Sequence, residues 1–258
     1  MVKYVIRRLG FLFLTVILTS IIIFAITEVL PGDVCRVILG REVGEEALAA
    51  CREDLGLDKP VVYRYAKWLL DFTRGDWGTS YSTRTEIRPQ VMGRLRNSLM
   101  LAGMTLLIAV PISVILGVIA GFNEGKLIDR AISLSSLAVV GLPEFVTGIL
   151  LIEIYGHWLG WLPPNSSIRA GTGFVEAFPQ LILPALTATF VLLAYVSRLT
   201  RAGVIEELKR SYVRTAVLKG LTRRSVMVKH VLRNALLPTI TVLAISFGWL
   251  ISGLIVIE

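Results

Sequence analysis

Charged residues are scarce in this chain. Asp, Glu, Lys and Arg together make up 18% of its 258 residues, whereas 54% of the residues are hydrophobic. With a mean hydropathy of +0.70, the chain has more apolar surface than a soluble core of this length can bury. The scarcity of charge therefore excludes an ordinary soluble domain, and lipid must surround most of the chain.

The chain also lacks the motifs of an enzyme. It contains no G-x-x-x-x-G-K-[ST] phosphate-binding loop, so any ATP and Mg²⁺ that power it belong to separate subunits. His157 and His230 have no Cys or acidic cluster at metal-ligand spacing, and we expect no metal, cofactor or catalytic residue in this chain. A membrane-embedded enzyme that uses Glu144, Glu153 or His157 is the alternative, but paired carboxylates and Ser/His constellations are missing.

Internal repeats and low-complexity tracts are missing as well. Inverted repeats with broken midplane helices are typical of ion-coupled secondary transporters. The sequence shows no such symmetry, which argues against a secondary transporter as a further alternative.

Long uncharged runs, by contrast, are abundant. Each is long enough to cross roughly 30 Å of hydrocarbon as a helix of about 20 residues, and lipid tolerates such a run only as a helix because backbone groups need internal partners. Four runs contain no charge, and a fifth contains only Glu144 and Glu153. The chain is therefore predicted to be an all-α polytopic membrane bundle with five spans. They lie at residues 9–27, 97–123, about 131–155, 177–197 and 234–257.

Basic residues predict which side of the membrane each loop faces. Lys3, Arg7 and Arg8 precede the first run, which is too long for a signal-peptide core, so the positive-inside rule places the N-terminus in the cytoplasm. Residues 198–233, called the basic loop below, then face the cytoplasm too, and they carry ten basic and two acidic residues. Topology thus explains most of the +8 net charge, without a nucleic-acid-binding surface.

The loop predicted to lie outside, residues 31–96, contains the only two cysteines of the chain. Cys35 and Cys51 then lie in an oxidising compartment. A disulfide between them closes a loop of about 15 residues and stabilises this outer lobe by about 3 kcal/mol. Two free buried thiols are the alternative, because spacing does not determine disulfide geometry.

Two helices are predicted within the outer lobe. Residues 45–54 form a short polar helix, and a second helix begins with Asp58 as its N-cap and Pro60 in its first turn. Its apolar face lies either at the headgroup boundary or against the membrane spans. The side chains that recur at helical spacing on this face are Val62, Tyr65, Leu69 and Phe72.

The basic loop is predicted to form a helix, a tight corner and another helix. The fourth span continues to about Lys209, since no Pro or cap intervenes, and residues 211–219 form a short helix. Gly220 stands where a C′ residue with positive φ would end that helix. Thr222 then caps a third helix.

Within this loop, the pattern Arg214-Thr215-Ala216-x-x-x-Gly220, followed by LRNALLP at residues 232–238, resembles the "EAA" loop of ABC-importer permeases. The resemblance is to the first, "B-type" permease of the dipeptide, oligopeptide and nickel family. Further blocks match this family in the same order along nearly the whole chain. They are YVIRR at 4–8, LPGD at 30–33, DLGLDKP at 54–60, GDWG at 75–78 and LGWLP at 159–163.

The resemblance implies a type I ABC-importer permease in the cytoplasmic (inner) membrane. Besides the lipid bilayer, the expected partners are a second homologous permease, two ATP-binding subunits and an extracytoplasmic substrate-binding protein. Family members typically continue beyond Glu258 into a sixth span. The expected division of the chain is an N-terminal anchor at 1–30, the outer lobe at 31–96 and a permease core at 97–258, in which the basic loop is the coupling loop.

The same resemblance assigns coupling to the ATPase subunits to four residues of the basic loop. Arg214 would pair with a carboxylate of the partner, and small Ala216 would allow close approach. Gly220 would supply the turn. Thr215, the second position of the motif, completes the set.

Glu144 is the candidate residue for the translocation path. An ionisable residue within a span is a functional candidate, and Glu144 follows Pro143, where the helix is expected to bend. It faces either a polar path or a peptide amine, whereas Glu153, near the membrane boundary, is expected to reach water. The predicted function is ATP-driven import of di- or oligopeptides. Nickel, glutathione and oligosaccharide importers share the permease pattern and stay as alternatives.

Overall fold

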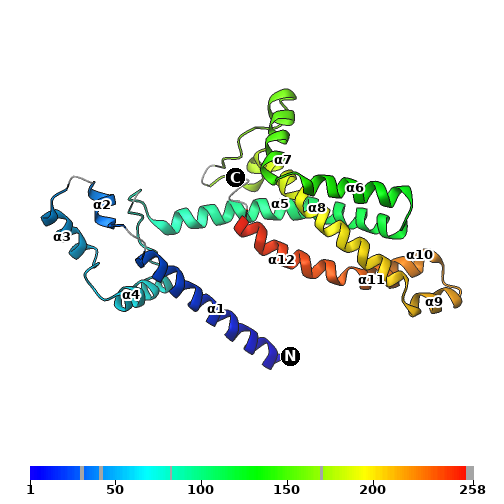
Figure 1. Ribbon diagram of the computed structural model, residues 1–258, viewed down its shortest axis with the longest axis horizontal. Helices are drawn as coiled ribbons and strands as arrows, with labels where there is room; N and C mark the ends of the chain where they lie inside the picture. Colours follow the sequence, from blue (N-terminus) through cyan, green and yellow to red (C-terminus); the bar gives the residue numbers. More distant parts are fainter. Residues whose placement is uncertain (30–31, 41–42, 82, 169–170, 254–258) are drawn as a thin grey trace. The chain divides into compact units, whose positions relative to one another are not determined.

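The structure is a computed structural model, drawn in Figure 1, and all regular elements in its described residues are helices, apart from one isolated antiparallel bridge between Thr79 and Glu86. The prediction of an all-α chain is confirmed for these residues. The chain divides into two compact units, Met1–Met92 and Gly93–Glu258. The described residues are 1–29, 32–40, 43–81, 83–168 and 171–253.

The first unit contains four helices and the start of a fifth. The long helix α1 (Val2–Val29) is followed by α2 (Val34–Leu39), α3 (Glu45–Asp54) and α4 (Val61–Arg74). α3 covers the residues predicted for the short polar helix, and its first turn carries two glutamates, which favour a helix N-terminus. The short polar helix predicted at residues 45–54 is thus present.

The start of α4 differs from the prediction. Pro60, with ψ of 139°, is the N-cap residue, and no side chain caps the helix, so the assignment of Asp58 as the N-cap is wrong. Lys59 precedes a proline and therefore avoids the helical conformation, which prevents a helix capped by Asp58 from starting there. Gly75 ends α4 in the left-handed conformation, with φ of 93°.

The apolar face of α4 packs against α1. Phe24 of α1 contacts Tyr65 and Trp68 of α4, with ring centroids 5.3 and 6.3 Å apart. The hydroxyl groups of Ser20 and Tyr65 share a hydrogen bond of 2.7 Å. Tyr65 of the predicted apolar face thus lies against a candidate span, which is one of the two expected positions, whereas Val62 is 80% exposed.

A disulfide and an ion pair connect the two short helices α2 and α3. Cys35 of α2 is bonded to Cys51 of α3, with their Cα atoms 5.9 Å apart. Asp33 caps α2 by accepting a hydrogen bond of 3.0 Å from the backbone N–H of Cys35, and it forms an ion pair with Arg52. The hydrogen bond from Arg52 lowers the pKa of the Asp33 carboxyl group.

We predict that Cys35 and Cys51 are linked in protein isolated from its native membrane, so that peptide mapping without reductant recovers a fragment containing both. Replacing both cysteines by serine should lower the free energy of unfolding by about 3 kcal/mol, because a closed loop of this length restricts the unfolded chain. Denaturant unfolding measures this loss. Reductant should not affect the double variant, which is the control, and two free thiols in the map would contradict the bridge.

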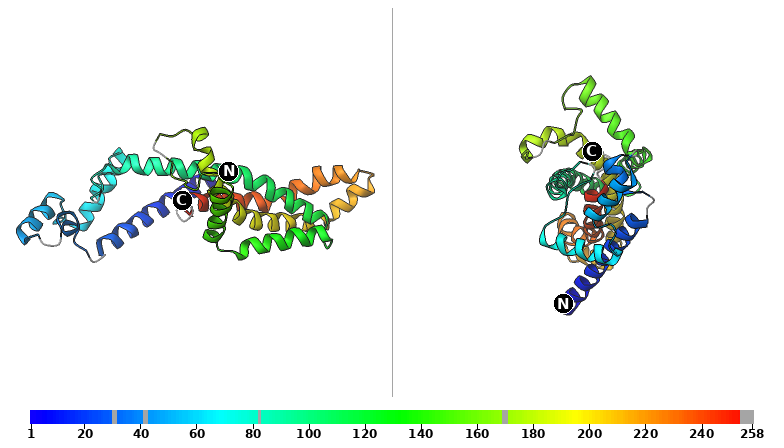
Figure 2. Two further views of the ribbon diagram at one scale, coloured as in Figure 1. Left: turned by 90° about the horizontal axis from the view of Figure 1, so that it is seen from above. Right: turned by 90° about the vertical axis from the view of Figure 1, so that its left-hand side faces the viewer.

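The second unit is built around α8, which contacts α6, α7, α11 and α12. Its long helices run alongside one another, and α9 and α10 lie at one end of the unit, as Figure 1 and the left-hand view of Figure 2 show. Its elements are α5 (Ile87–Phe122), α6 (Leu127–Gly141), α7 (Glu144–Leu151), the π-helical segment η1 (Ile152–Trp158), α8 (Phe174–Leu208), α9 (Ser211–Leu218), α10 (Arg223–Ser225), the π-helical segment η2 (Val226–Val231), α11 (Leu232–Ala235) and α12 (Leu237–Gly253).

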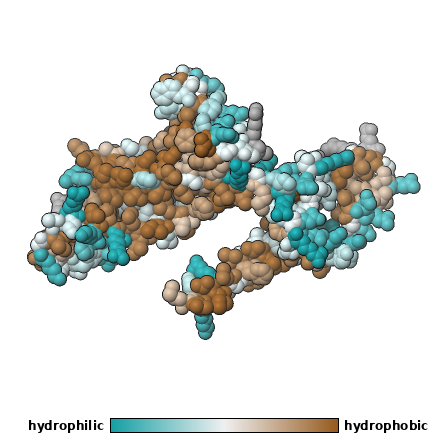
Figure 3. Space-filling view, turned by 180° about the vertical axis from the view of Figure 1, so that it is seen from behind, coloured by the Kyte–Doolittle hydropathy of each residue, from teal (hydrophilic) through white to brown (hydrophobic). Residues whose placement is uncertain are grey.

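The long helices account for the predicted membrane spans. α1, α5 and α8 are each long and apolar enough to cross a membrane, and two bent helix pairs raise the number of candidate spans among the described residues to five. Figure 3 shows apolar side chains along the long helices of the second unit and hydrophilic ones at the end that carries α9 and α10. This distribution is typical of a bundle embedded in lipid with one polar end.

The predicted third span, at residues 131–155, is not one continuous helix. α6 and the segment formed by α7 and η1 meet at an angle of 97°. Leu142 between them is extended, with ψ of 131°, because the residue before a proline avoids the helical conformation. A bend was expected at Pro143, but the observed angle interrupts the helix completely. The segment is therefore a broken span or a re-entrant turn.

Glycines on α5 and α8 allow three helices to approach closely. A Cβ atom on Gly117 of α5 would lie 2.5 Å from the backbone oxygen of Ser197 on α8, and one on Gly121 would lie 2.7 Å from the Val204 side chain. A Cβ atom on Gly203 of α8 would lie 2.6 Å from a backbone oxygen of α11. Small residues four apart are typical of tightly packed membrane helices.

We expect Gly117→Ala to lower the thermal unfolding midpoint of the detergent-solubilised protein. The added methyl group must push α5 and α8 apart, at a cost of about 2 kcal/mol. Gly103→Ala on the same helix is the matched control, because a Cβ atom there meets nothing within 4 Å, and alanine is the better helix former. Equal unfolding midpoints for the two variants would contradict the close contact of α5 with α8.

Candidate functional site

The basic loop folds into a short helix that ends in a tight corner. α9 follows α8 after two residues, and Gly220 closes it with φ of +78°. The N–H of Gly220 donates to the carbonyl oxygen of Val217 at 2.9 Å, and the N–H of Leu221 donates to that of Ala216 at 3.3 Å. These two bonds form a Schellman motif. The positive φ predicted for Gly220 is present.

The chain then turns into the next helix at Thr222. The N–H of Ser225 donates to the Thr222 hydroxyl at 3.4 Å, and the N–H of Val226 donates to the Thr222 carbonyl oxygen at 3.0 Å. Thr222 thus caps α10 as predicted. Local hydrogen bonds thus define the corner at both ends.

α9 has an inner and an outer face. Val213 and Ala216, each 8% exposed, form one apolar cluster with residues of α8, η2 and α11. Val217 and Leu218 are 56% and 81% exposed. The outer face of α9 is defined by four exposed residues: Arg214, Thr215, Val217 and Leu218.

Burial changes the interpretation of Ala216. The sequence pattern favours close approach of a partner at this residue, but its side chain is buried against the chain's own apolar cluster. A small residue is needed here because α9 packs directly on the helices that carry it. Ala216 therefore supports α9 from the inside, and Val217 and Leu218 provide the exposed apolar area.

Tyr212 connects α9 to both neighbouring helices. Its hydroxyl donates to Glu207 of α8 at 2.5 Å and accepts from the Asn234 side chain of α11 at 3.3 Å. Burial, followed by the hydrogen bond to Glu207, raises the pKa of Tyr212, so the hydroxyl keeps the proton that it donates. Sequence patterns gave no signal for this contact, because Glu207 and Tyr212 are ordinary residue types for a membrane-surface helix.

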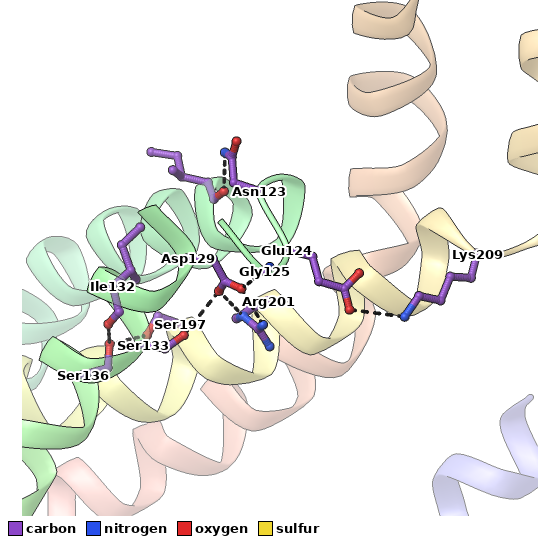
Figure 4. Close-up of polar contacts among 11 residues, drawn as sticks. Asn123, Glu124, Gly125, Asp129, Ile132, Ser133, Ser136, Ser197, Arg201 and Lys209 are labelled. Atoms are coloured by element: carbon purple, nitrogen blue, oxygen red, sulfur yellow. Dashed lines mark hydrogen bonds and ion pairs between the residues drawn. The ribbon is translucent and has the colours of Figure 1, made fainter. Parts of the chain in front are cut away.

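An ion pair ties α8 to the start of α6, as Figure 4 shows. Arg201 donates through Nε and Nη2 to the two carboxylate oxygens of Asp129, at 2.5 and 2.7 Å. The backbone N–H of Gly125 donates to the same carboxylate at 2.8 Å. Nearby, Lys209 and Glu124 form a more exposed ion pair of 3.3 Å. Asp129 is buried, so removing Arg201 would leave a buried charge uncompensated.

We predict that Tyr212→Phe loosens α9 without unfolding the protein. Loss of the two hydrogen bonds should cost about 1 kcal/mol, which raises the hydrogen-exchange rate of α9 amides about fivefold if local opening controls exchange. Exchange measured by mass spectrometry tests this. Tyr195→Phe is the control, since Tyr195 lies exposed on α8 and its variant should leave α9 unchanged. Unchanged exchange in Tyr212→Phe would contradict the bridging role.

A second polar site lies where α7 packs on α8. Glu144 is in the first turn of α7, and its Oε1 atom is buried without a hydrogen-bond partner among the described residues. The Oε1 atom of Gln180 on α8 is likewise buried without a hydrogen-bond partner among the described residues. Both residues line one cavity of about 170 Å³. Glu153 differs, because it is half-exposed and lies 3.2 Å from His157.

Metal ligands do not assemble in the part of the chain that the structure describes. Groups of three or more His, Cys, Asp or Glu side chains that could hold a metal ion were not found among these residues. The His157 ring contacts one potential metal ligand, the Glu153 carboxylate, at 3.2 Å. The basic loop with α9 and the cavity beside Glu144 are candidate functional sites of the second unit.

The fold and the exposed α9 define a polytopic helical membrane protein with a short helix displayed at one polar end. Comparison with known families agrees with this class. The family described as "Binding-protein-dependent transport system inner membrane component" matches residues 113–258. The family described as "Binding-prot-dependent transport system membrane comp, N-term" matches residues 1–102.

Individual relatives are similar along the whole chain. The probable peptide ABC transporter permease protein y4tP of Sinorhizobium fredii is 32% identical over 255 residues, which cover 99% of this chain and 82% of that protein. The glutathione transport system permease protein GsiC of Escherichia coli K12 is 33% identical over 258 residues, covering 100% and 82%. The chain therefore belongs to the inner membrane component family of binding-protein-dependent transport systems, the permease subunits of ABC importers.

Proposed function

We propose that this chain imports peptides into the cytoplasm as one of two permease subunits, driven by separate ATPase subunits that dock on the outer face of α9. The observation that carries this proposal is a helix that packs one face on its own chain and exposes the other, in a member of an importer family. Relatives named for peptide and for glutathione transport support a peptide substrate. Glutathione, itself a small peptide, is the second candidate substrate.

The proposed orientation places the N-terminus and the basic loop in the cytoplasm. The excess of basic residues in this loop supports that side, because positively charged loops are retained there during insertion. The ATPase subunits then meet α9 and bring their own ATP and Mg²⁺. A substrate-binding protein delivers the peptide on the opposite side of the membrane, where we place the outer lobe. A second homologous permease completes the path.

The coupling step follows from the two faces of α9. Exposed Leu218 and Val217 supply apolar contact with an ATPase cleft, and Arg214 can pair with a carboxylate there. Movement of the ATPase is passed inward through the buried cluster that contains Val213 and Ala216. Close-packed contacts of this kind transmit displacement because they cannot be compressed.

Contacts of Tyr212 and of Asp129 distribute that movement within the permease. Tyr212 links α9 to α8 and α11. The pair of Asp129 and Arg201 links α8 to α6, and α6 leads to the break before Glu144. We therefore propose that a shift of α9 moves α8 and α6 together and changes the access to the cavity beside Glu144, which we assign to the translocation path.

Replacing Leu218 by Asp tests the docking surface. The variant should insert into the membrane normally, but the amount of ATPase that co-purifies should fall at least about tenfold, since a buried apolar anchor contributes this much to an interface. ATP-dependent uptake should fall in parallel. Val62→Asp is the matched control, because Val62 is an 80% exposed apolar residue of α4 in the other unit. Normal co-purification and uptake in Leu218→Asp would count against this surface.

A further inference from the structure

The cavity between α7 and α8 has a strong chemical bias. Two of its lining side chains, Glu144 and Gln180, present buried oxygen atoms without a hydrogen-bond partner among the described residues. Thr187, also in the lining, uses its hydroxyl to donate to the Leu183 carbonyl oxygen at 3.0 Å. No Lys, Arg or His is among the described residues that line the cavity. The described part of the lining therefore offers hydrogen-bond acceptors and includes no cation.

Buried acceptors of this kind require a donor. An unpaired carboxylate oxygen removed from water is costly, and the cost is offset by a ligand that brings positive charge and N–H groups. A primary ammonium group satisfies both needs, because it is a compact charge with three donors. An anion or a neutral apolar ligand would leave both oxygen atoms unsatisfied.

We propose that this cavity binds the free amino terminus of the transported peptide, with Glu144 and Gln180 accepting hydrogen bonds from its ammonium group. This inference rests on the proposed function and names the part of the substrate that the permease itself recognises. The ammonium group of a linear peptide and that of glutathione are chemically equivalent for this purpose, so the inference holds for both candidate substrates.

The dimensions of the cavity limit what it holds. At about 170 Å³, it is smaller than the roughly 300–1,000 Å³ of a pocket that encloses a whole drug-sized ligand. It accommodates the first residue of a peptide, while the remaining residues extend out of it. Phe145, Ile149 and Leu183 in the lining provide apolar contact for the first side chain. The cavity thus distinguishes one end of the peptide from the other.

The location of Glu144 makes it suitable for a site that changes during transport. Glu144 begins α7 directly after the 97° break, whereas Gln180 belongs to α8, which is continuous to the basic loop. The two acceptors are therefore carried by elements that can shift relative to each other at the break. A ligand held by both is released when they separate.

The test uses the complete transporter, reconstituted with its second permease, ATPases and binding protein in proteoliposomes. The probes are a peptide with a free amino terminus and its N-acetylated form, supplied at concentrations that load the binding protein equally. In Glu144→Gln, uptake of the free peptide should fall about tenfold, because one charge-assisted hydrogen bond is lost. Uptake of the acetylated peptide should change less than about twofold, since it makes no such bond.

Glu153→Gln is the matched control, because Glu153 is a half-exposed carboxylate in η1, the continuation of α7. This variant should retain the wild-type ratio of the two uptake rates. An equal fall for both peptides in Glu144→Gln, an unchanged ratio, or loss of the partner subunits on co-purification would overturn the inference. All three outcomes are measured on the variant and are compatible with peptide transport by the wild-type complex. Wild-type complexes that transport neither peptide would instead overturn the proposed function, and this inference with it.

Discussion

The close approach of helices around α8 is the constraint on which the second unit depends. Lipid supplies no hydrophobic drive for helices to associate, so they rely on van der Waals packing and interhelical hydrogen bonds. Gly117 and Gly121 bring α5 against one side of α8, and Gly203 brings α11 against another. Thr200 and Thr239 add a buried hydrogen bond of 3.1 Å between α8 and α12. Because α8 leads directly into α9, the position of the exposed helix depends on these contacts.

Two kinds of buried polar group follow from this packing and serve different purposes. Asp129 is surrounded by donors from Arg201 and Gly125, so its charge is compensated within the chain and it holds α6 on α8. Glu144 and Gln180 have buried oxygen atoms that no described residue satisfies. Compensated groups such as Asp129 stabilise a structure. The oxygen atoms of Glu144 and Gln180 belong to residues that line the same cavity, where a ligand can satisfy both. The contrast separates the structural part of the permease from its proposed binding site.

Local rules predicted the elements of this chain better than their junctions. The helix at 45–54 has two glutamates in its first turn, and the corner at Gly220 depends on a residue that tolerates positive φ; both elements are present. Asp58 was not an N-cap, and the third span was broken by 97° at Pro143. In both cases a proline restricts the residue before it, and periodicity in the flanking sequence does not reveal how far the chain then turns.

The sequence by itself determined that this chain lies in lipid, that its long uncharged runs are helices and that a short helix ends at Gly220, because these follow from composition and from interactions within a few residues. Tertiary structure decided that Ala216 faces inward and Leu218 outward. It also decided that Arg201 pairs with Asp129, 72 residues away. Such outcomes depend on which helices meet and at what rotation. Those are set by packing across the whole bundle, which no local pattern encodes.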